Sequence, residues 1–432
     1  MQMIKDVRIE SGNEIHVVIG DELFDALKRH RVLQARELVY KIIWQYPSLN
    51  GEGTELSELP KDLLQVPLIL NLAPIVWRLG LKVEIERLES VFAQSLGELY
   101  LSYRRLWKEL PWSGKIEVLE LTANNEEGFS EDGASLFSFG VDSVATFIRH
   151  KAHIKSLISI VGADVDCSDQ DGANEFKTQS QLVSQRFGVR SIGIQSNLKD
   201  ILNYSALSKL IPQWTDWWTN FQHGPSLVAY LLIVAYAFKC KNAYIAASDH
   251  TDYLARLGSR PDLEGILKYG SVSVIHDGTD MLRQQKVALI GKEWNEPLHV
   301  CWKAKSFKNC GCCEKCIRTI LAFLVEGDLE SISRYFLGSP DYEQIKKYVI
   351  KLFSKDYLFD WGDVGEYEGI KKFLLTDEQY RKQYLFTETQ MEIIRILRDF
   401  VPYEKFCEDL MKQYAKERGF FSIKKNNFHA SW

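Results

Sequence analysis

The sequence lacks a long unbroken hydrophobic run, a strong excess of charge of one sign, and any internal repeat or low-complexity tract. Its 53 lysine and arginine residues against 58 aspartate and glutamate residues leave a net charge of −5, too near neutral to indicate a nucleic-acid surface. A membrane span needs about 20 nearly uncharged residues, whereas prolines and charged residues interrupt the most apolar window, Leu63 to Val83. We expect no nucleic-acid partner, no membrane insertion, and a buried core segment in this window.

We expect no secretory signal in this sequence, because Met1 to Val7 contains no apolar h-region and no small-residue cleavage site. Four of the eight cysteines fall between Cys310 and Cys316. Such clustering suggests metal binding in a reducing compartment rather than disulfide bonds. We therefore expect a cytoplasmic protein.

At 432 residues the chain is long enough for two or three domains with an ample core. The first part shows no catalytic motif. Apolar and polar residues alternate there as in strands at 7–10, 14–20 and 115–121, and apolar residues recur at helical spacing over 21–46 and 85–110. An acidic, turn-rich stretch at 122–133 is the best boundary. The sequence predicts an N-terminal α+β accessory region (1–130), a central domain (131–320) and a helical C-terminal region (321–432).

From residue 134 onward short apolar runs alternate with helical patterns. We expect strands at 135–139, 157–162, 189–194 and 243–247, with helices at 142–153, 172–187, 198–211 and 225–239 between them. This alternation predicts an α/β fold with a doubly wound parallel sheet, whose ligand crevice lies at the carboxyl ends of the strands. Further helices are expected in the C-terminal region at 317–326, 342–353, 390–400 and 403–418.

Several carboxylates follow the predicted strands, where such a crevice would lie. Asp164 and Asp166 follow the second strand, and Asp249 and Asp252 follow the fourth, together with Ser248. A solvated loop or a helix cap is the simpler explanation for any single one of them.

The stretch Ser138-Phe-Gly-Val-Asp-Ser143 joins the first of these strands to a helix. Backbone N–H groups without intrahelical partners point out of such a turn, and the helix dipole adds positive potential, so the turn can bind an anion. Gly140 permits close approach to the backbone, and Ser138 and Ser143 supply hydroxyls. Asp142 would either cap the helix or help to hold a metal ion, and a plain capped turn remains the alternative.

A second motif, Cys301-x8-Cys310-x2-Cys313-x2-Cys316, contains Cys312 as an extra thiol. Four thiolates can close a tetrahedral shell around Zn²⁺ with no open position, which is typical of a structural site. Nearby lysines lower the cost of gathering thiolates. A redox pair or an iron–sulfur cluster is the rival interpretation, and Cys312 keeps it open.

The Ser138–Ser143 stretch resembles the S-G-G-x-D-S/T loop of the N-type ATP pyrophosphatases, the PP-loop family. Phe139 stands where that family has its first glycine, and a positive φ would be costly there, although some relatives of phosphoadenylyl-sulfate reductases also carry Ser-Phe-Gly. The resemblance implies a HUP-type sheet and cleavage of ATP between its α- and β-phosphates with Mg²⁺. It assigns Ser138, Asp142 and Ser143 to catalysis, and to ATP binding it assigns these three with Phe139, Gly140, Val141 and Gly162.

Together the two motifs resemble the QueC family of 7-cyano-7-deazaguanine synthases, over roughly residues 135–322. The cysteine tail carries the resemblance, and Asp252-Tyr253 and Gly258–Asp262 are similar to the family's Asp-Tyr-Ser-Gly-Tyr-Pro-Asp segment. The family's arginine sits one residue beyond Arg318, and His223-Gly224 replaces its Arg-Asn, so neither contact is carried over.

This resemblance implies that a 7-carboxy-7-deazaguanine carboxylate attacks the α-phosphorus of ATP and that an amine then displaces AMP to form an amide. A second ATP would dehydrate the amide to a nitrile in the family itself. It implies a Zn²⁺ site at the four cysteines. A carboxylate, Asp252 or Asp262, would read the guanine-like edge, Tyr253 would stack on the ring, and Asp249 completes the proposed substrate contacts.

The chain is about twice as long as the family's core and so resembles QueC-like proteins of anti-phage defence operons. Some of those join the deazaguanine to a partner protein's amino terminus, which implies a protein acceptor here. Three alternatives remain open: a synthase that uses ammonia, a PP-loop sulfur transferase with Cys312 or Cys167 carrying sulfur, and a nucleotide sensor without catalysis. For the two extensions, stabilisation or homodimerisation is the simpler role.

Overall fold

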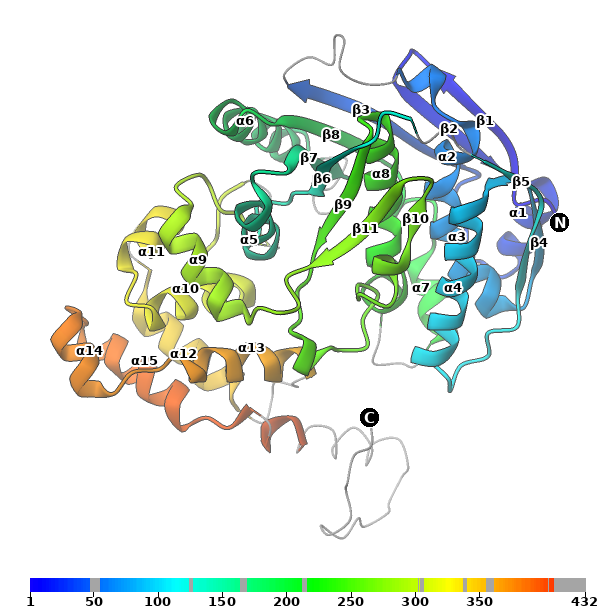
Figure 1. Cartoon of the computed structure of the whole chain (residues 1–432). Helices are drawn as coiled ribbons and strands as arrows, with labels where there is room; N and C mark the ends of the chain where they lie inside the picture. The colour runs from blue at the N-terminus through cyan, green and yellow to red at the C-terminus, as the bar shows by residue number, and fades with distance from the viewer. Residues whose placement is uncertain are drawn as a thin grey trace, which may run out of the picture.

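A nine-stranded mixed sheet forms the centre of the protein (Figure 1). The strands lie in the order β1-β2-β3-β8-β7-β6-β9-β11-β10, and β4 pairs with β5 in a separate two-stranded parallel sheet. The structure, a computed structural model, describes residues 1–46, 55–123, 127–163, 169–211, 216–301, 303, 307–336, 340–354, 361–402 and 404–407. The strands are β1 Ile4–Glu10, β2 Glu14–Ile19, β3 Glu37–Tyr46, β4 Lys82–Glu89, β5 Lys115–Thr122, β6 Ser130–Leu136, β7 Ile154–Val161, β8 Arg190–Ser196, β9 Cys240–Ala246, β10 Lys268–Tyr269 and β11 Val272–Asp277.

The inner five strands of the large sheet, β8, β7, β6, β9 and β11, are parallel. From β6 the chain builds β7 and β8 on one side, then crosses to build β9 and β11 on the other. The strand order therefore reverses between β6 and β9, and in open α/β sheets ligands bind outside the carboxyl ends of the strands at such a reversal. The predicted α/β class is confirmed, and the sheet is parallel in its five inner strands, whereas β1, β2, β3 and β10 join it through antiparallel pairs.

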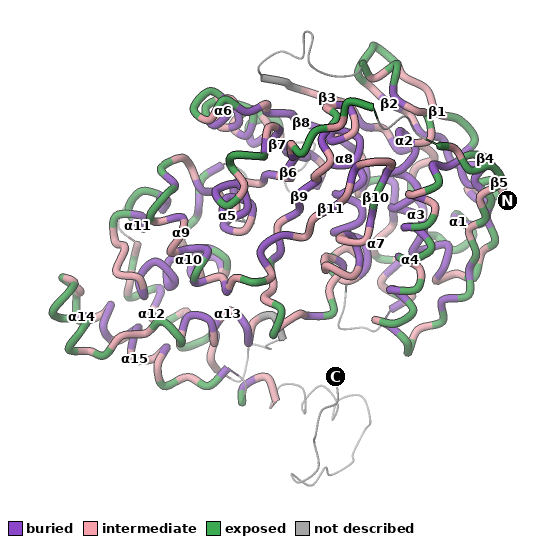
Figure 2. The backbone as a smooth tube through the Cα atoms, in the orientation of Figure 1, coloured by how far each residue is buried: buried purple, intermediate pink, exposed green. Residues whose placement is uncertain are grey.

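Two hydrophobic cores cover the two faces of this sheet. Helices α3 (Val66–Leu79) and α8 (His223–Ala237) belong to one core, and α8 is buried almost all round because it lies between the sheet and α3 (Figure 2). The other core includes α5, α6, α9 and α10 with the C-terminal helices. Their bounds are α5 Val141–His150, α6 Gln170–Phe187, α9 Arg283–Glu293, α10 Glu314–Val325, α11 Leu329–Tyr335, α12 Tyr342–Leu352, α13 Trp361–Lys372, α14 Asp377–Gln383 and α15 Glu388–Asp399.

The N-terminal region differs from the prediction in two places. A single long helix was expected over 21–46 and another over 85–110, and in each place a strand forms as well as a helix. Helix α1 (Asp21–Arg29) ends beside Arg31, whose φ is 58°, and the chain then forms β3, paired with β2 and β8. Residues 82–89 form β4, with alternating buried and exposed side chains, before α4 (Ser90–Leu106) begins. Glu89 fixes that start, because its carboxylate accepts bonds from the N–H groups of Val91 and Phe92. In both places the period-2 pattern prevails over the helical spacing.

Other expectations are confirmed. Strands β1 and β2 pair around a turn at Ser11 and Gly12, whose φ values are positive, and the apolar window becomes the short α2 (Lys61–Leu64) and the buried α3. The predicted helix at 198–211 is wrong, because only α7 (Tyr204–Leu207) and a 3₁₀ turn form there.

In the C-terminal region α10, α12 and α15 match predicted helices, and the helix expected at 403–418 lies mostly outside the described residues. The strands β1 to β3 of the N-terminal region extend the central sheet through the β3–β8 pair.

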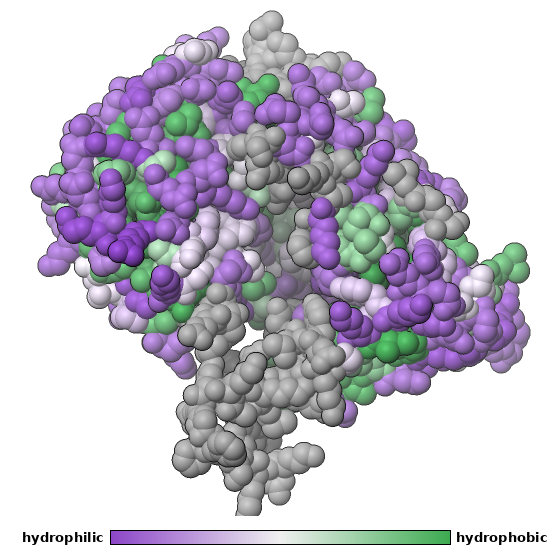
Figure 3. All heavy atoms as spheres, turned by 180° about the vertical axis from the view of Figure 1, so that it is seen from behind, coloured by the Kyte–Doolittle hydropathy of each residue, from purple (hydrophilic) through white to green (hydrophobic). Residues whose placement is uncertain are grey.

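The surface shown in Figure 3 is mostly hydrophilic, with hydrophobic residues in small scattered groups. Across the part of the chain that is described, we find no helix with the length and apolarity needed to cross a membrane.

Candidate functional site

The Ser138–Ser143 loop lies at the carboxyl end of β6, beside the reversal point, and leads into α5. Ser143 Oγ donates to the carbonyl of Gly140 (3.1 Å), and the Ser138 and Ser143 hydroxyls are 3.4 Å apart. The Ser138 and Gly140 N–H groups make only long contacts with these hydroxyls, at 3.3 and 3.4 Å. Such distances are near the limit of a hydrogen bond, so the donors of the loop are weakly engaged and could turn to an anion.

Phe139 takes up the positive φ that we expected to be costly at this position, with φ of 60°. A left-handed conformation costs a non-glycine residue about 1–2 kcal/mol. The phenyl ring is fully buried against Phe137, Phe176 and Phe307, with ring centroids 4.6, 5.7 and 5.0 Å away. Burying a phenylalanine contributes about 1.5–3 kcal/mol, which offsets the backbone strain. A side chain at the family's glycine position is therefore compatible with the loop geometry.

Asp142 does not cap α5, because the N-cap residue is Gly140 and no side chain bonds to the first turn. Instead its two carboxylate oxygens pair with Lys286 Nζ (3.0 Å) and Arg283 Nη1 (3.2 Å). Burial alone would raise the pKa of Asp142, but Lys286 and then Arg283 outweigh burial and lower it. The carboxylate is thus ionised, and the two cations hold it in place at the end of the loop, in the first turn of α5.

Lys286 connects this loop to the next strand. Its side chain is only 2 % exposed, and Nζ also donates to the carbonyl of Ala247 (2.6 Å), directly after β9. One buried ammonium group therefore ties together the chain segments that follow β6 and β9. Sequence reasoning missed Lys286 and Arg283, since α9 follows an unpredicted strand, β11, and carries no motif.

A chain of buried charges continues from Arg283 to the C-terminal region. Glu366 on α13 pairs with Arg283 Nε (3.6 Å) through one oxygen and with Arg318 Nη1 (3.4 Å) through the other. Arg318 also pairs with Glu314 (3.3 Å) in the first turn of α10. Burial would lower the pKa of Arg318, but Glu366 and Glu314 raise it.

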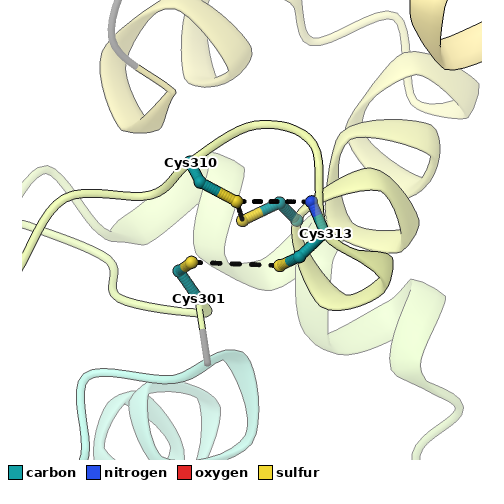
Figure 4. A group of neighbouring side chains, drawn as sticks. Cys301, Cys310 and Cys313 are labelled. Carbon is teal, nitrogen blue, oxygen red and sulfur yellow. Dashed lines mark hydrogen bonds between the residues drawn. The ribbon is translucent and has the colours of Figure 1, made fainter. Parts of the chain in front are cut away.

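The four predicted metal ligands converge in space, because the sulfur atoms of Cys301, Cys310, Cys313 and Cys316 lie within 4.8 Å of one another. Figure 4 shows three of them, Cys301, Cys310 and Cys313, at this cluster. The Cys301–Cys313 and Cys310–Cys316 separations are both 3.9 Å, and a tetrahedral shell with Zn–S bonds of about 2.3 Å requires sulfur separations of about 3.8 Å. The geometry therefore fits a metal site with four cysteine ligands. Exposed Cys312 lies outside this group of four, with its sulfur 3.6 Å from that of Cys310.

The cysteine loop packs directly against the Ser138–Ser143 loop. Phe307, between Cys301 and Cys310, belongs to the aromatic cluster around Phe139, and the His299 N–H donates to the Phe139 carbonyl (2.8 Å). Asn309 Oδ1 holds the cysteine loop by accepting the N–H of Cys301 (3.1 Å). A metal bound by the cysteines would thus stabilise the segment that supports the strained residue of the loop.

The remaining predicted residues are more dispersed. Gly162 directly follows β7 and has a φ of 101°. Asp164, Asp166 and Cys167 lie outside the described residues. Both oxygens of Asp262 are engaged, one by Arg260 (2.8 Å) and the other by Arg105 (3.7 Å).

Asp249, Asp252 and Tyr253 share one short segment after β9. Asp249 accepts the N–H of Ala255 (2.8 Å), which closes the segment into a turn. The Asp252 side chain is 69 % exposed, with one oxygen 3.5 Å from His250 Nδ1, so it has room to accept further hydrogen bonds.

A surface cavity of about 580 Å³ lies elsewhere, between β1, α2 and β4, and contains none of these residues. Comparisons of the chain with protein-family models, with curated proteins and with solved structures found no match.

Proposed function

We propose that this protein is an ATP-dependent ligase of the PP-loop type, which adenylates a 7-carboxy-7-deazaguanine carboxylate and transfers it to an amine. One observation carries the proposal: the Ser138–Ser143 loop, with its weakly engaged donors, lies beside the ionised Asp142 where the strand order reverses. Its resemblance to the PP-loop, together with the four-cysteine cluster, narrows the reaction to this class.

The loop suits a leaving pyrophosphate. Backbone N–H groups at the start of α5 and the hydroxyls of Ser138 and Ser143 would donate to its oxygens, since donors already in place stabilise charge that develops in the transition state. Lys286 and Arg283 would neutralise part of that charge. Asp142 is the residue that would hold Mg²⁺, which supplies further neutralisation of the phosphates when bound.

The chemistry needs ATP because a resonance-stabilised carboxylate is a poor electrophile. Its oxygen attacks the α-phosphorus of ATP, the bond to the β-phosphate oxygen breaks, and pyrophosphate leaves. The amine nitrogen then attacks the acyl carbon, the bond to AMP breaks, and the nitrogen loses a proton. The product is an amide, with one ATP converted to AMP and pyrophosphate.

For the base, the proposal favours Asp252 over Asp262. A guanine-like edge presents two N–H donors to a carboxylate, which needs free acceptor positions. Arg260 and Arg105 already engage the two oxygens of Asp262, whereas the Asp252 side chain is exposed. Tyr253 follows Asp252 directly and is the nearest candidate for stacking on the ring.

The acceptor in this proposal is the α-amine of a partner protein. An α-amine has a pKa of about 8 and a useful neutral fraction at neutral pH, whereas a lysine side chain at about 10.4 has very little. A chain terminus can also enter a crevice that a folded surface cannot. The function would then belong to an anti-phage defence system, as the enlarged chain suggests by its resemblance.

Zn²⁺ in the four cysteines would be structural, since four thiolates leave no coordination position for a substrate. The metal would affect the reaction indirectly, because it would stabilise the cysteine loop, whose Phe307 packs on Phe139 of the Ser138–Ser143 loop.

The test is mass spectrometry after incubation with ATP, Mg²⁺, 7-carboxy-7-deazaguanine, and either ammonia or a candidate partner protein. We expect a partner protein heavier by the acylating base and modified at its first residue. Efficient conversion of free ammonia to the nitrile without any partner would assign the chain to queuosine-precursor synthesis instead. Persulfide on Cys312 after incubation with a sulfur donor would favour a sulfur transferase.

A further inference from the structure

Helix α13, from the C-terminal region, packs onto two elements of the proposed nucleotide crevice, α9 and the 3₁₀ turn Thr251–Tyr253. The approach to the turn is close. A Cβ added at Gly365 would lie 2.6 Å from Tyr253 Cβ and 2.7 Å from its Cγ, distances that real side chains do not adopt. Glycine is therefore the residue that lets α13 reach the segment that carries Asp252 and Tyr253.

The next residue of α13, Glu366, lies between two arginines of different helices. Its carboxylate gives one oxygen to Arg283 of α9 and one to Arg318 of α10, and its side chain is only 10 % exposed. Arg283 in turn reaches Asp142 with Nη1 and the Thr319 hydroxyl with Nη2 (3.4 Å). A single side chain, that of Arg283, therefore connects the carboxylate of Glu366 on α13 to the carboxylate of Asp142 in the first turn of α5.

The charges in this group balance. Three cations, Arg283, Lys286 and Arg318, face three carboxylates, those of Asp142, Glu366 and Glu314. Without the charge of Glu366, the nearly buried guanidinium groups of Arg283 and Arg318 would each lose one carboxylate partner. Arg283 would then draw closer to Asp142, the other carboxylate that it pairs with, because buried charges need compensation. The position of Arg283 relative to the loop depends on α13.

We propose that α13 is a wall of the nucleotide crevice and that Glu366 is a positioning residue, which holds Arg283 and Arg318 so that Asp142 and the Ser138–Ser143 loop stay open to ATP. This inference rests on the proposed function for the identity of the ligand. It gives the C-terminal region a role in the ATP site itself, through a carboxylate that touches neither the loop nor the nucleotide.

The experiment compares Glu366→Gln, Glu366→Asp and the matched control Glu368→Gln. The control removes the same charge from the same helix, whereas the ion pairs with Arg283 and Arg318 come from Glu366. ATP affinity is measured by isothermal titration calorimetry with Mg²⁺ in the full-length protein, and thermal stability is followed in parallel. We expect Glu366→Gln to weaken ATP binding about tenfold, the low end of what outer-shell partners contribute. Glu366→Asp keeps the charge and should recover most of the affinity, and Glu368→Gln should match the wild type.

Unchanged ATP affinity in a folded Glu366→Gln variant would overturn the proposal and leave Glu366 with a purely structural role. Tighter ATP binding would also overturn it, because the carboxylate would then be competing with phosphate for the arginines. If Glu366→Gln does not fold, Glu366→Asp decides on a smaller scale: it should keep the fold and bind ATP more weakly than Glu368→Gln but by less than tenfold, and an affinity equal to that of Glu368→Gln would overturn the proposal.

A second readout does not require ATP. Amide hydrogen exchange of the Ser138–Ser143 segment should be faster in Glu366→Gln than in Glu368→Gln, because Arg283 then leaves the position in which it supports the first turn of α5. If the wild type binds no ATP, the proposed function fails, and the exchange comparison alone decides whether α13 holds the loop. Equal exchange in the two variants refutes the positioning role.

Discussion

Asp142→Ala should destabilise the protein as well as abolish pyrophosphate release, because it leaves a buried lysine without its carboxylate. Lys286 is 2 % exposed, and among the residues that the structure describes its ammonium group bonds to the Ala247 carbonyl besides Asp142. Breaking a buried ion pair by removing one partner costs about 3–5 kcal/mol. Since the Asp142 side chain is 21 % exposed and Ala247 remains, we expect about 3 kcal/mol.

The matched experiment is a double-mutant cycle with Lys286→Met, which removes the charge and keeps the length of the side chain. The double variant should be more stable than Asp142→Ala alone, because no uncompensated ammonium group is left in the interior. Chemical denaturation of the four proteins measures the coupling energy. If Asp142→Ala is as stable as the wild type, or if the two effects simply add, the ion pair does not hold the loop to α9 as described here.

Other predictions concern the metal, the strained residue and a surface histidine. Cys313→Ser should lose bound zinc and have a lower melting temperature, since a structural metal contributes folding free energy. Cys312→Ser should keep the metal. Metal analysis of both proteins tests this, and loss of zinc from Cys312→Ser alone would show that the four ligands were assigned wrongly. Phe139→Ala should lower the free energy of unfolding by about 3–5 kcal/mol, because it removes the ring at the centre of an aromatic cluster and keeps the left-handed backbone. Chemical denaturation measures this change. An unchanged stability would show that the ring does not support the loop. His16 is partly buried, which lowers its pKa, but Glu37 and Glu14 outweigh burial and raise it. Its contribution to stability is therefore complete below the unfolded pKa of about 6.5 and is lost as pH rises through the higher folded value, so the stability difference between wild type and His16→Gln should shrink on going from pH 6 to pH 9 in denaturation experiments. A difference that grows over this range would contradict the ion pairs of His16 with Glu14 and Glu37.

Local patterns predicted much of the central sheet. The apolar runs of β7, β8 and β9 and the helices α5, α6 and α8 carry their own periodicity, so each could be placed from its own residues. The strand expected at 135–139 instead spans Ser130–Leu136 as β6, and the helix expected at 198–211 does not form. The four-cysteine cluster was predictable for a similar reason, because three of its four ligands lie close together in the sequence, from Cys310 to Cys316, and tetrahedral geometry restricts their spacing.

The failures share a physical cause, which is that long-range pairing decides the structure. Residues 37–46 have apolar side chains at helical spacing but become β3, since β2 and β8 offer hydrogen-bonding edges on both sides. The ion pairs at Asp142 could not be read from the sequence either. Arg283 and Lys286 come to the loop from a helix more than 100 positions away, and Glu366 comes from a helix farther still. No spacing rule connects such residues.

Phe139 illustrates the limit of reasoning from one position. The expectation that φ > 0 would be costly is sound for an isolated residue, and the structure adds the compensation: three aromatic side chains from different elements surround the ring. The strain and its compensation belong to separate parts of the sequence.

The measurement that tests the central claim most directly is the nucleotide product formed with and without the proposed carboxylate. The purified full-length protein is incubated with ATP and Mg²⁺, alone or with 7-carboxy-7-deazaguanine, and nucleotides and pyrophosphate are quantified. The account predicts AMP and pyrophosphate in equal amounts only when the deazaguanine carboxylate is present. Formation of ADP, or AMP formation that does not depend on the carboxylate, would contradict it.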